Sequence, residues 1–250
     1  MGIEASKDHV DRVRQMAGEY GIAVSEDQAA LMVRHLAPVE RKNEVVNLTR
    51  IVDTQDGLVR HIVDSLLFVP PVVAQVVRAG GDGCLRVMDL GTGAGYPGIP
   101  LAVMADVDVT LLDSVEKKTR AVGEFVRELG LEDRAHALHG RVEDVAREEG
   151  QTYDVVTARA VASLNVLVEY AAPLLRKGGI LVASKGRPTQ EEREAGERAA
   201  RLCGMEAVSR ETYELPDEAG HREIYVYRKV SKPKARLPRQ SGMAKRSPLG

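Results

Sequence analysis

The sequence predicts an α/β protein with a mostly parallel sheet, and three observations predict it. Beyond about Leu85, short apolar runs alternate with amphipathic stretches at helical spacing, which is typical of parallel strands joined by helices. A glycine-rich turn follows the first of these runs, and two extended runs near the end are joined by a turn with Pro216 and Gly220. The chain has 250 residues, which is enough to bury one sizeable core.

Residues 1–70 predict a helical extension that precedes the sheet. Apolar side chains recur at helical spacing over the first twenty residues. Ser25 and Gln28 have the capping-box spacing, which predicts a second helix that Pro38 should end or kink. We expect a third helix from about Asp53 to Phe68, closed by the two prolines that follow.

Seven strands and five helices are expected in residues 71–230. The predicted strands are Leu85–Leu90, Val107–Leu112, His136–Leu138, Tyr153–Ala158, Ile180–Ser184, Glu206–Tyr213 and Arg222–Lys229. The predicted helices are Pro97–Met104, Glu116–Leu129, Val142–Glu149, Leu164–Leu175 and Thr189–Leu202. The fifth strand is expected to follow a turn at Lys177–Gly179, and the last two strands form an antiparallel hairpin that closes the sheet edge.

The charge is distributed unevenly along the chain. The formal net charge is −2, but residues 228–250 carry eight basic side chains and no acid, so the remainder sums to −10. A basic tail on an acidic body is typical of a protein with a polyanionic partner, although a solvated terminus has the same composition. Several prolines and glycines make a long helix in 231–250 unfavourable, and we expect this tail to be flexible.

Composition argues against several classes of protein. Cys84 and Cys203 are too few for a disulfide framework, and no Cys-x-x-Cys pair is present, so we expect no metal site. The first residues lack the apolar core of a secretory signal, and no uninterrupted apolar run reaches the ~18 residues of a membrane helix. We therefore expect a soluble, cytoplasmic protein without a membrane partner.

The glycine-rich turn is the sharpest motif in the sequence. It runs from Asp89 to Gly95 and lies where a strand ends and a helix begins. Glycines permit a tight turn and let the backbone approach a ligand closely. The next strand ends at Asp113, 20 positions after Gly93, where an acid can accept hydrogen bonds from ribose hydroxyls. A nucleoside-containing ligand is therefore expected at the carboxyl edge of the first two strands.

Two kinds of nucleoside ligand fit this turn. Gly93, Gly95 and Gly98 have the spacing of the dinucleotide fingerprint, which keeps a nicotinamide-dependent oxidoreductase open. Asp89, however, places an acid at the start of the turn, where a dinucleotide would bring its pyrophosphate. The acid-x-Gly-x-Gly-x-Gly string instead resembles the first motif of class I, Rossmann-like, S-adenosylmethionine-dependent methyltransferases. Asp154 in the fourth strand agrees with that resemblance.

A combination of strings resembles one family closely, the RsmG (GidB) 16S ribosomal RNA guanine-N7 methyltransferases. The strings are Asn47–Thr49, Arg60–Leu66, Asp89–Pro100, Leu112–Ser114, Arg141–Glu143, Arg159–Ala160, Lys185–Gly186 and the basic ending Pro238–Leu249. The resemblance implies that residues 71–230 form a class I methyltransferase domain. It also implies S-adenosylmethionine as cofactor, the 16S RNA of the small subunit or its precursor as partner, and guanine 527 as target. We expect a monomer.

The resemblance and the motif together assign candidate site residues. The expected cofactor contacts are Asp89, Gly91, Gly93, Gly95, Tyr96, Asp113, Val142, Glu143 and Arg159. The expected RNA contacts are Arg60, His61, Lys185, Arg236, Arg239, Lys245 and Arg246. The alternative for Arg60, His61 and Asp64 is an ion pair that holds the N-terminal helices to the sheet, and the helical spacing of Arg60 and Asp64, which places both on one helix face, favours it.

The residues missing from the expected site argue against several methyl-transfer reactions. Neither cysteine is expected near the methyl donor, which argues against C5 methylation of a pyrimidine. The fourth strand is followed by Ala158–Val161 rather than the Asn/Asp-Pro-Pro-aromatic loop of many amine methyltransferases. Guanine N7 carries a lone pair, so we expect catalysis by approximation without a general base. Three alternatives stay open. The target could be another RNA atom, with Lys185 as the base for a hydroxyl, or the substrate could be a small molecule. The protein could also be an RNA-binding assembly factor without catalytic activity.

Overall fold

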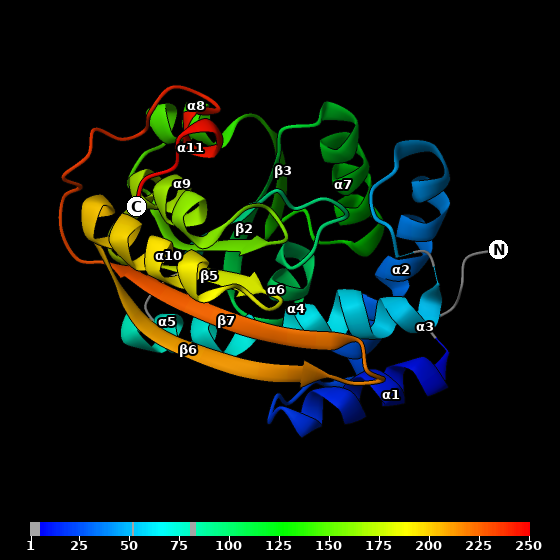
Figure 1. Ribbon diagram of the computed structural model, residues 1–250. Helices are drawn as coiled ribbons and strands as arrows, with labels where there is room; N and C mark the ends of the chain where they lie inside the picture. The colour runs from blue at the N-terminus through cyan, green and yellow to red at the C-terminus, as the bar shows by residue number, and fades with distance from the viewer. Residues whose placement is uncertain (1–5, 52, 81–83) are drawn as a thin grey trace.

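A seven-stranded sheet forms the centre of the computed structural model, which describes residues 6–51, 53–80 and 84–250 (Figure 1). The strands are β1 Leu85–Leu90, β2 Val107–Asp113, β3 Ala135–His139, β4 Tyr153–Arg159, β5 Leu175–Lys185, β6 Met205–Leu215 and β7 Gly220–Lys229. Their order in the sheet is β3-β2-β1-β4-β5-β7-β6. The first five strands are parallel, and β7 pairs antiparallel with both β5 and β6. The predicted fold class is therefore confirmed.

The strand order places a crevice at the carboxyl ends of β1 and β4. β1 lies between β2 and β4, so the chain leaves β1 toward one side of the sheet and later returns to its other side. Leu90 at the end of β1 pairs with Leu112 of β2 and with Ala158 of β4. Loops diverge at such a switch point, and ligands of open α/β sheets bind there.

Two hydrophobic clusters cover the two faces of the sheet. Along β1, Val87 belongs to one cluster and Met88 to the other, because successive strand side chains point to opposite faces. The N-terminal helices, α6 Gly98–Met104 and α7 Glu116–Leu129 pack on the first face. The second face is covered by α8 Val142–Glu148, α9 Leu164–Leu174 and α10 Gln190–Cys203. All five were predicted, with bounds that differ by one residue at most.

The first two N-terminal helices are α1 Lys7–Glu19 and α2 Glu26–Val46. The predicted capping box is present, since Gln28 N–H donates to the Ser25 hydroxyl and the Gln28 side chain accepts from Ser25 N–H. Pro38 was expected to end or kink α2, but the helix continues for two more turns, so an end at Pro38 is wrong. Leu36, Ala37 and Val39 are buried around it, and this packing offsets the hydrogen bond that proline cannot donate.

The third predicted helix is split into several pieces. They are α3 Thr54–Gly57, the π-helix η1 Leu58–Val63 and α4 Asp64–Leu66. Pro70 and Pro71 were expected only to close this segment. They also lie in the first turn of a further helix, α5 Val69–Arg78, which the sequence analysis missed. Proline suits a first helical turn because its missing N–H has no partner there.

This helical run, Thr54–Arg78, is long and apolar enough to cross a membrane by length and composition. It is nevertheless interrupted by Arg60 and Asp64, and 72% of its most apolar stretch is buried inside the protein. Leu58, Ile62 and Leu66 pack in the same cluster as the sheet residues of the first face. The run therefore behaves as the core helix of a globular domain.

The fifth strand begins earlier than predicted, and the C-terminal tail packs on the second face of the sheet. β5 begins at Leu175, so Lys177–Gly179 lies within the strand and not before it, at a shift of register against β4. Residues 231–250 fold back over the second face and end with the short helix α11 Met243–Arg246, beside α8 and α9 (Figure 1). Ala244 of α11 is buried in the cluster of that face.

Candidate cofactor and substrate site

The glycine-rich turn folds tightly over the end of β1. Gly91, Gly93 and Gly95 all have positive φ, at 64°, 60° and 95°. Gly91 is constrained twice, because a Cβ there would also lie 2.9 Å from Val161 Cγ2. Thr92 N–H donates to the carbonyl of Leu112 at 3.0 Å, which ties the turn to the end of β2. Position 91 therefore requires glycine, both for its backbone conformation and for lack of space for a side chain.

Asp89 supports this turn from below. Its carboxylate accepts from Gly98 N–H at 3.1 Å and from the Thr157 hydroxyl at 2.9 Å. Burial raises the pKa of Asp89 to about 6, although the hydrogen bonds to its carboxylate act in the opposite direction. Asp89 was predicted to contact the cofactor, but it does not line either hollow of the site. Its carboxylate is used by the protein itself, to hold the turn and the start of α6.

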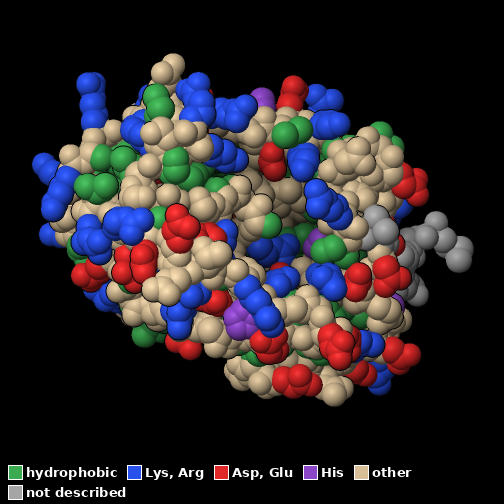
Figure 2. Space-filling view, viewed as in Figure 1, with side chains coloured by type: hydrophobic (Ala, Val, Ile, Leu, Met, Phe, Trp, Pro, Cys, Tyr) green, Lys and Arg blue, Asp and Glu red, His purple; other side chains and the backbone are tan. Residues whose placement is uncertain are grey.

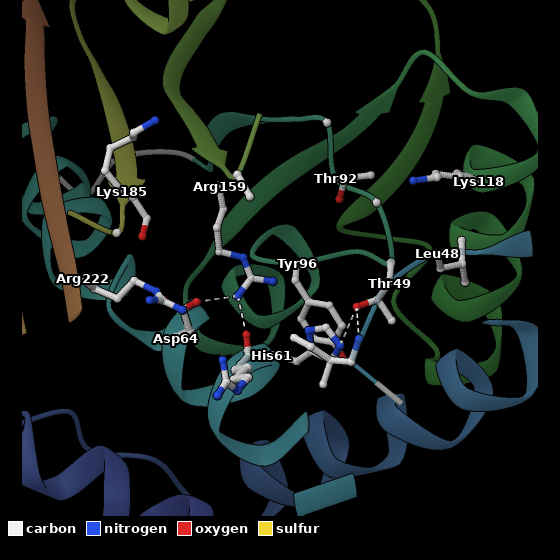
Figure 3. Close-up of a pocket in the computed structure, with 18 residues that line it drawn as sticks. Leu48, Thr49, His61, Asp64, Thr92, Tyr96, Lys118, Arg159, Lys185 and Arg222 are labelled. Atoms are coloured by element: carbon white, nitrogen blue, oxygen red, sulfur yellow. Dashed lines mark hydrogen bonds and ion pairs between the residues drawn. The ribbon is translucent and has the colours of Figure 1, made fainter. Parts of the chain in front are cut away.

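The main hollow has a volume of about 440 Å³ and opens at the carboxyl ends of β1, β4 and β5 (Figure 3). Five parts of the chain line it: the segment after α2, the helical segment of η1 and α4, the glycine-rich turn, the first turn of α7, and the ends of β4, β5 and β7 with their adjoining loops. The residues are Leu48, Thr49, Ile51, Arg60, His61, Asp64, Gly91–Ala94, Tyr96, Lys118, Arg159, Ala160, Ser184–Gly186 and Arg222. The hollow thus joins residues of the N-terminal helices to residues of the sheet.

Asp64 lies between two arginines at the floor of this hollow (Figure 3). Its Oδ2 lies 3.3 Å from Nη1 of Arg159, and its Oδ1 accepts from Nε of Arg222 at 3.0 Å. Arg159 also donates to the carbonyl of Arg60 at 2.9 Å. Asp64 is 3% exposed, so one buried carboxylate faces two guanidinium groups and the cluster keeps a net positive charge.

The suggested pair between Arg60 and Asp64 is not formed. Arg60 Nε lies 3.5 Å from Asp56, one turn earlier. Asp64 instead joins the helical extension to the sheet through Arg159 of β4 and Arg222 of β7. The expected ion pair between the N-terminal helices and the sheet is therefore present, and Asp64 makes it with Arg159 and Arg222.

Tyr96 is stacked between two histidines below the turn. Its ring centroid lies 4.5 Å from that of His61 and 4.6 Å from that of His35. Burial lowers the pKa of each histidine to about 3, so both rings are neutral at pH 7. His61 was predicted to contact RNA. The ring is 4% exposed, lies 3.3 Å from the Thr49 hydroxyl and lines the larger hollow.

Lys185 lies at the rim, at the end of β5. Its Nζ donates to the carbonyl of Ala162 at 2.9 Å and pairs with Glu192 at 2.9 Å. In Figure 3 the side chain points away from Tyr96 and Asp64. An RNA ligand that used this ammonium group would have to compete with Glu192.

A second hollow of about 90 Å³ adjoins the first, and Gly91 lines both. Its lining residues are Leu90, Gly91, Leu112–Ser114, Gly140–Glu143, Val161, Tyr170 and Lys245. Asp113 accepts from Gly93 N–H at 3.2 Å and from Val115 N–H at 2.9 Å. The carboxylate at the end of β2 is therefore fixed in orientation beside the turn.

The predicted site residues divide between the two hollows. Gly91, Gly93, Tyr96 and Arg159 line the larger one with Arg60, His61 and Lys185, whereas Asp113, Val142, Glu143 and Lys245 line the smaller one. Neither is lined by Asp89, Gly95, Arg236, Arg239 or Arg246. The sequence analysis missed His35, Thr92, Lys118 and Arg222. Thr92 lies within the glycine-rich turn and Arg222 begins the last predicted strand, whereas no local pattern pointed to His35 or Lys118.

The site has room and polar groups for a ligand with a nucleoside at one end and a small polar group at the other. A Cβ built on Gly93 would meet only carbonyl oxygens, at 3.8 Å and 3.9 Å, so the turn leaves space above it. The Thr92 hydroxyl is buried and lines the hollow, and a hydrogen bond from it to the Asp89 carboxylate opposes the rise in the pKa of Asp89.

The strand order, the glycine-rich turn after β1 and the acid that ends β2 define a Rossmann-like methyltransferase fold. Solved structures agree on this fold. The cofactor-bound protein Rv0187 from MTB superposes with a TM-score of 0.51 and 20% identity over 78% of this chain and 89% of that one. A putative RNA methyltransferase, PH1948 from Pyrococcus horikoshii, has a TM-score of 0.50 and 16% identity over 64% of this chain and 82% of that one.

The family follows from sequence comparison. The model of the GidB family, rRNA small subunit methyltransferase G, matches residues 28–221. The Ribosomal RNA small subunit methyltransferase G of Desulfitobacterium hafniense is 39% identical over 83% of each chain. The protein of that name from Deinococcus radiodurans is 39% identical over 95% of this chain and 91% of its own. The chain therefore belongs to the small-subunit ribosomal RNA methyltransferase G family, as its motifs indicated.

Proposed function

We propose that this protein transfers the methyl group of S-adenosylmethionine to N7 of a guanine in 16S ribosomal RNA, guanine 527 in the usual numbering. The observation that carries this proposal is the pair of hollows joined at Gly91, one suited to a nucleoside and one lined by cations. The family supports the class of RNA, and the resemblance of the motifs supports the atom and the position. We place the reaction in the cytoplasm, where small subunits are assembled.

The smaller hollow would hold the adenosine end of the cofactor. Asp113 can accept from the ribose hydroxyls, and Val142 and Glu143 face the same space as expected for the adenine. Gly91, Thr92 and Gly93, which line the larger hollow beside it, would hold the amino-acid end. The bound cofactor supplies an electrophilic methyl group on a sulfonium.

The larger hollow would hold the guanine without a general base. N7 attacks with a lone pair and carries no proton, so no base has to remove one. His61 is a neutral stacked ring and Asp64 is engaged by two arginines, and neither is free to take a proton from a substrate. The other charged side chains of this hollow are Lys and Arg, whose donors suit guanine O6 and phosphate oxygens. Alignment of N7 with the methyl group then supplies much of the rate.

The charge around the hollow favours a nucleic acid over a small apolar substrate. Figure 2 shows Lys and Arg side chains gathered around the hollow in the middle of this face. Five cations line it, Arg60, Lys118, Arg159, Lys185 and Arg222, against one acid, Asp64. Phosphate contacts of this kind supply most of the salt-dependent affinity for RNA.

A methyl-transfer assay tests the proposal. Purified protein, labelled S-adenosylmethionine and small subunits that lack the modification are incubated, and the RNA is digested to nucleosides. We expect the label in 7-methylguanosine, at one site that primer extension then maps. Label in another nucleoside would keep the cofactor and discard the target. Cofactor binding without any label would favour an assembly factor or a small-molecule substrate, and protection by NAD alone would favour an oxidoreductase.

A further inference from the structure

The basic tail is anchored to the second face of the sheet through one buried ion pair. Arg239 donates from Nε and Nη2 to both oxygens of Glu169, at 2.6 Å and 2.5 Å. Glu169 is 3% exposed, and such bidentate pairs are the strong ones. Arg239 also donates to the carbonyl of Ser247, which ties the tail to itself. The guanidinium that was expected to face RNA is therefore used to hold the tail in place.

This anchor brings the tail against Glu143. Gly242 N–H donates to Oε1 of Glu143 at 2.7 Å, and the Ser241 hydroxyl lies 3.2 Å from Asp144. Glu143 is 6% exposed and lines the smaller hollow. Within the described residues no hydrogen bond engages its other oxygen, Oε2. The tail thus fixes the orientation of this carboxylate and leaves one oxygen for a ligand.

The tail also supplies a wall of the smaller hollow. Lys245 of α11 lines it together with Asp113 and Glu143, although more than 100 positions separate Lys245 from either acid. A carboxylate and an ammonium group in one small space complement adenine, which has a donor amine and acceptor ring nitrogens. The neighbouring Arg246 does not line either hollow.

We propose that the tail is part of the cofactor site. Lys245 contacts the nucleoside end of S-adenosylmethionine, and the Arg239–Glu169 pair is a positioning contact that holds Glu143 in place through Gly242. This inference rests on the proposed cofactor. By linkage, a tail that favours nucleoside binding must itself be docked more firmly when the nucleoside is bound.

Calorimetric titration of the full chain with S-adenosylhomocysteine tests the contacts. Lys245→Met keeps the length of the side chain and removes its charge. Arg239→Gln loosens the anchor without touching the hollow. We expect each to weaken binding by about tenfold, the loss of roughly one charge-assisted hydrogen bond. Lys234→Met, an exposed lysine of the same tail outside both hollows, is the matched control and should bind like the wild type.

A second measurement tests the linkage. Trypsin cleaves the tail after its basic residues, and mass spectrometry follows the loss of the C-terminal peptide. We expect S-adenosylhomocysteine to slow this cleavage in the wild type and to do so less in Arg239→Gln. Thermal unfolding without ligand shows whether the Arg239→Gln variant is folded. If it is unfolded, Lys245→Met still tests the inference, because it changes only one exposed side chain.

The outcomes separate the inference from the proposed function. A wild type that binds the nucleoside with variants that bind equally well would overturn the role of the tail and leave the methyltransferase proposal intact. Variants that keep the nucleoside affinity and lose RNA binding would return the tail to the RNA contact that its charge predicts. A wild type that binds no S-adenosylhomocysteine would overturn the cofactor and the inference with it.

Discussion

Burial is the main influence on the pKa values of the individual side chains at this site. Asp89, His35, His61 and Tyr96 are all buried near the turn, and burial raises or lowers the pKa of each group toward its neutral form. Two of them, Asp89 and His61, carry polar atoms that the sequence assigned to ligands. In the folded protein Asp89 holds the turn and His61 stacks on Tyr96, and the surface of the larger hollow also presents the backbone of the turn and the arginines.

Asp89 makes a pH-dependent contribution to stability. Its pKa is about 6 in the folded protein against an ordinary 3.8, so the folded state binds more protons than the unfolded state between these values. The free energy of unfolding therefore falls as the pH rises from 4 to 6, by up to about 3 kcal/mol from this group. Asp89→Asn, which can keep the contacts to Gly98 and Thr157, should flatten that fall.

Urea denaturation at several pH values between 4.5 and 7 measures this effect. The exposed Asp133→Asn is the control and should follow the wild type. Parallel curves for Asp89→Asn and the wild type would show that Asp89 does not cost stability when it ionises.

At the scale of elements, the two hollows lie between the ends of strands and the ends of helices. The turn after β1, the first turns of α7 and α8, and the π-helix η1 each contribute residues to one of the two hollows. α7 shows how finely this is set, because Lys118 lines the larger hollow whereas the adjacent Lys117 is exposed and lines neither. Successive helical residues point about 100° apart, so neighbours in sequence have different surroundings.

This difference predicts unequal effects of two equal substitutions. Lys118→Gln should weaken binding to small-subunit RNA and lower the slope of log affinity against log salt by about one, because one phosphate contact is lost. Lys117→Gln should change both much less. Filter binding at several salt concentrations measures the two slopes. Equal effects would mean that the whole helix surface, and not the hollow, binds the RNA.

At the scale of the molecule, the N-terminal helices and the sheet share one hydrophobic cluster. Ile62 of η1 is fully buried in the cluster that also holds Val87 of β1 and Ile99 of α6. Asp64 adds an ionic tie between the same parts. The helical extension is therefore packed as part of one domain, and the mouth of the larger hollow is built from both halves.

Shared packing predicts a single unfolding transition. Ile62→Ala should lower the free energy of unfolding by about 2–5 kcal/mol, the usual cost of a cavity in a core, and shift the transition of the whole protein. Val45→Ala, at a side chain that is 78% exposed, should change it by less than about 0.5 kcal/mol. Urea denaturation followed by circular dichroism measures both. A separate early transition for Ile62→Ala would mean that the helical extension unfolds independently.

Local patterns in the sequence determined the strands, most helices, the glycine-rich turn, Asp113 and the family. Such features depend on periodicity and on residues close in sequence, for example the capping box at Ser25 and the strand that ends at Leu90. The predicted bounds of elements were least accurate where proline or glycine is compatible with two local structures, as at Pro38 and at Lys177–Gly179. Proline both ends helices and begins them, and local spacing does not decide between these roles.

Only the tertiary structure decided what the charged and aromatic side chains do. Asp64 meets Arg159 and Arg222, 95 and 158 positions away, and Arg239 meets Glu169 across 70 positions. The sequence identified most of these residues as important, but it assigned His61 and Arg239 to RNA. Charge and residue type are visible in the chain, whereas burial and the identity of the partner depend on which elements pack together. That packing places Lys245 of the tail in the wall of the smaller hollow, which the sequence did not predict.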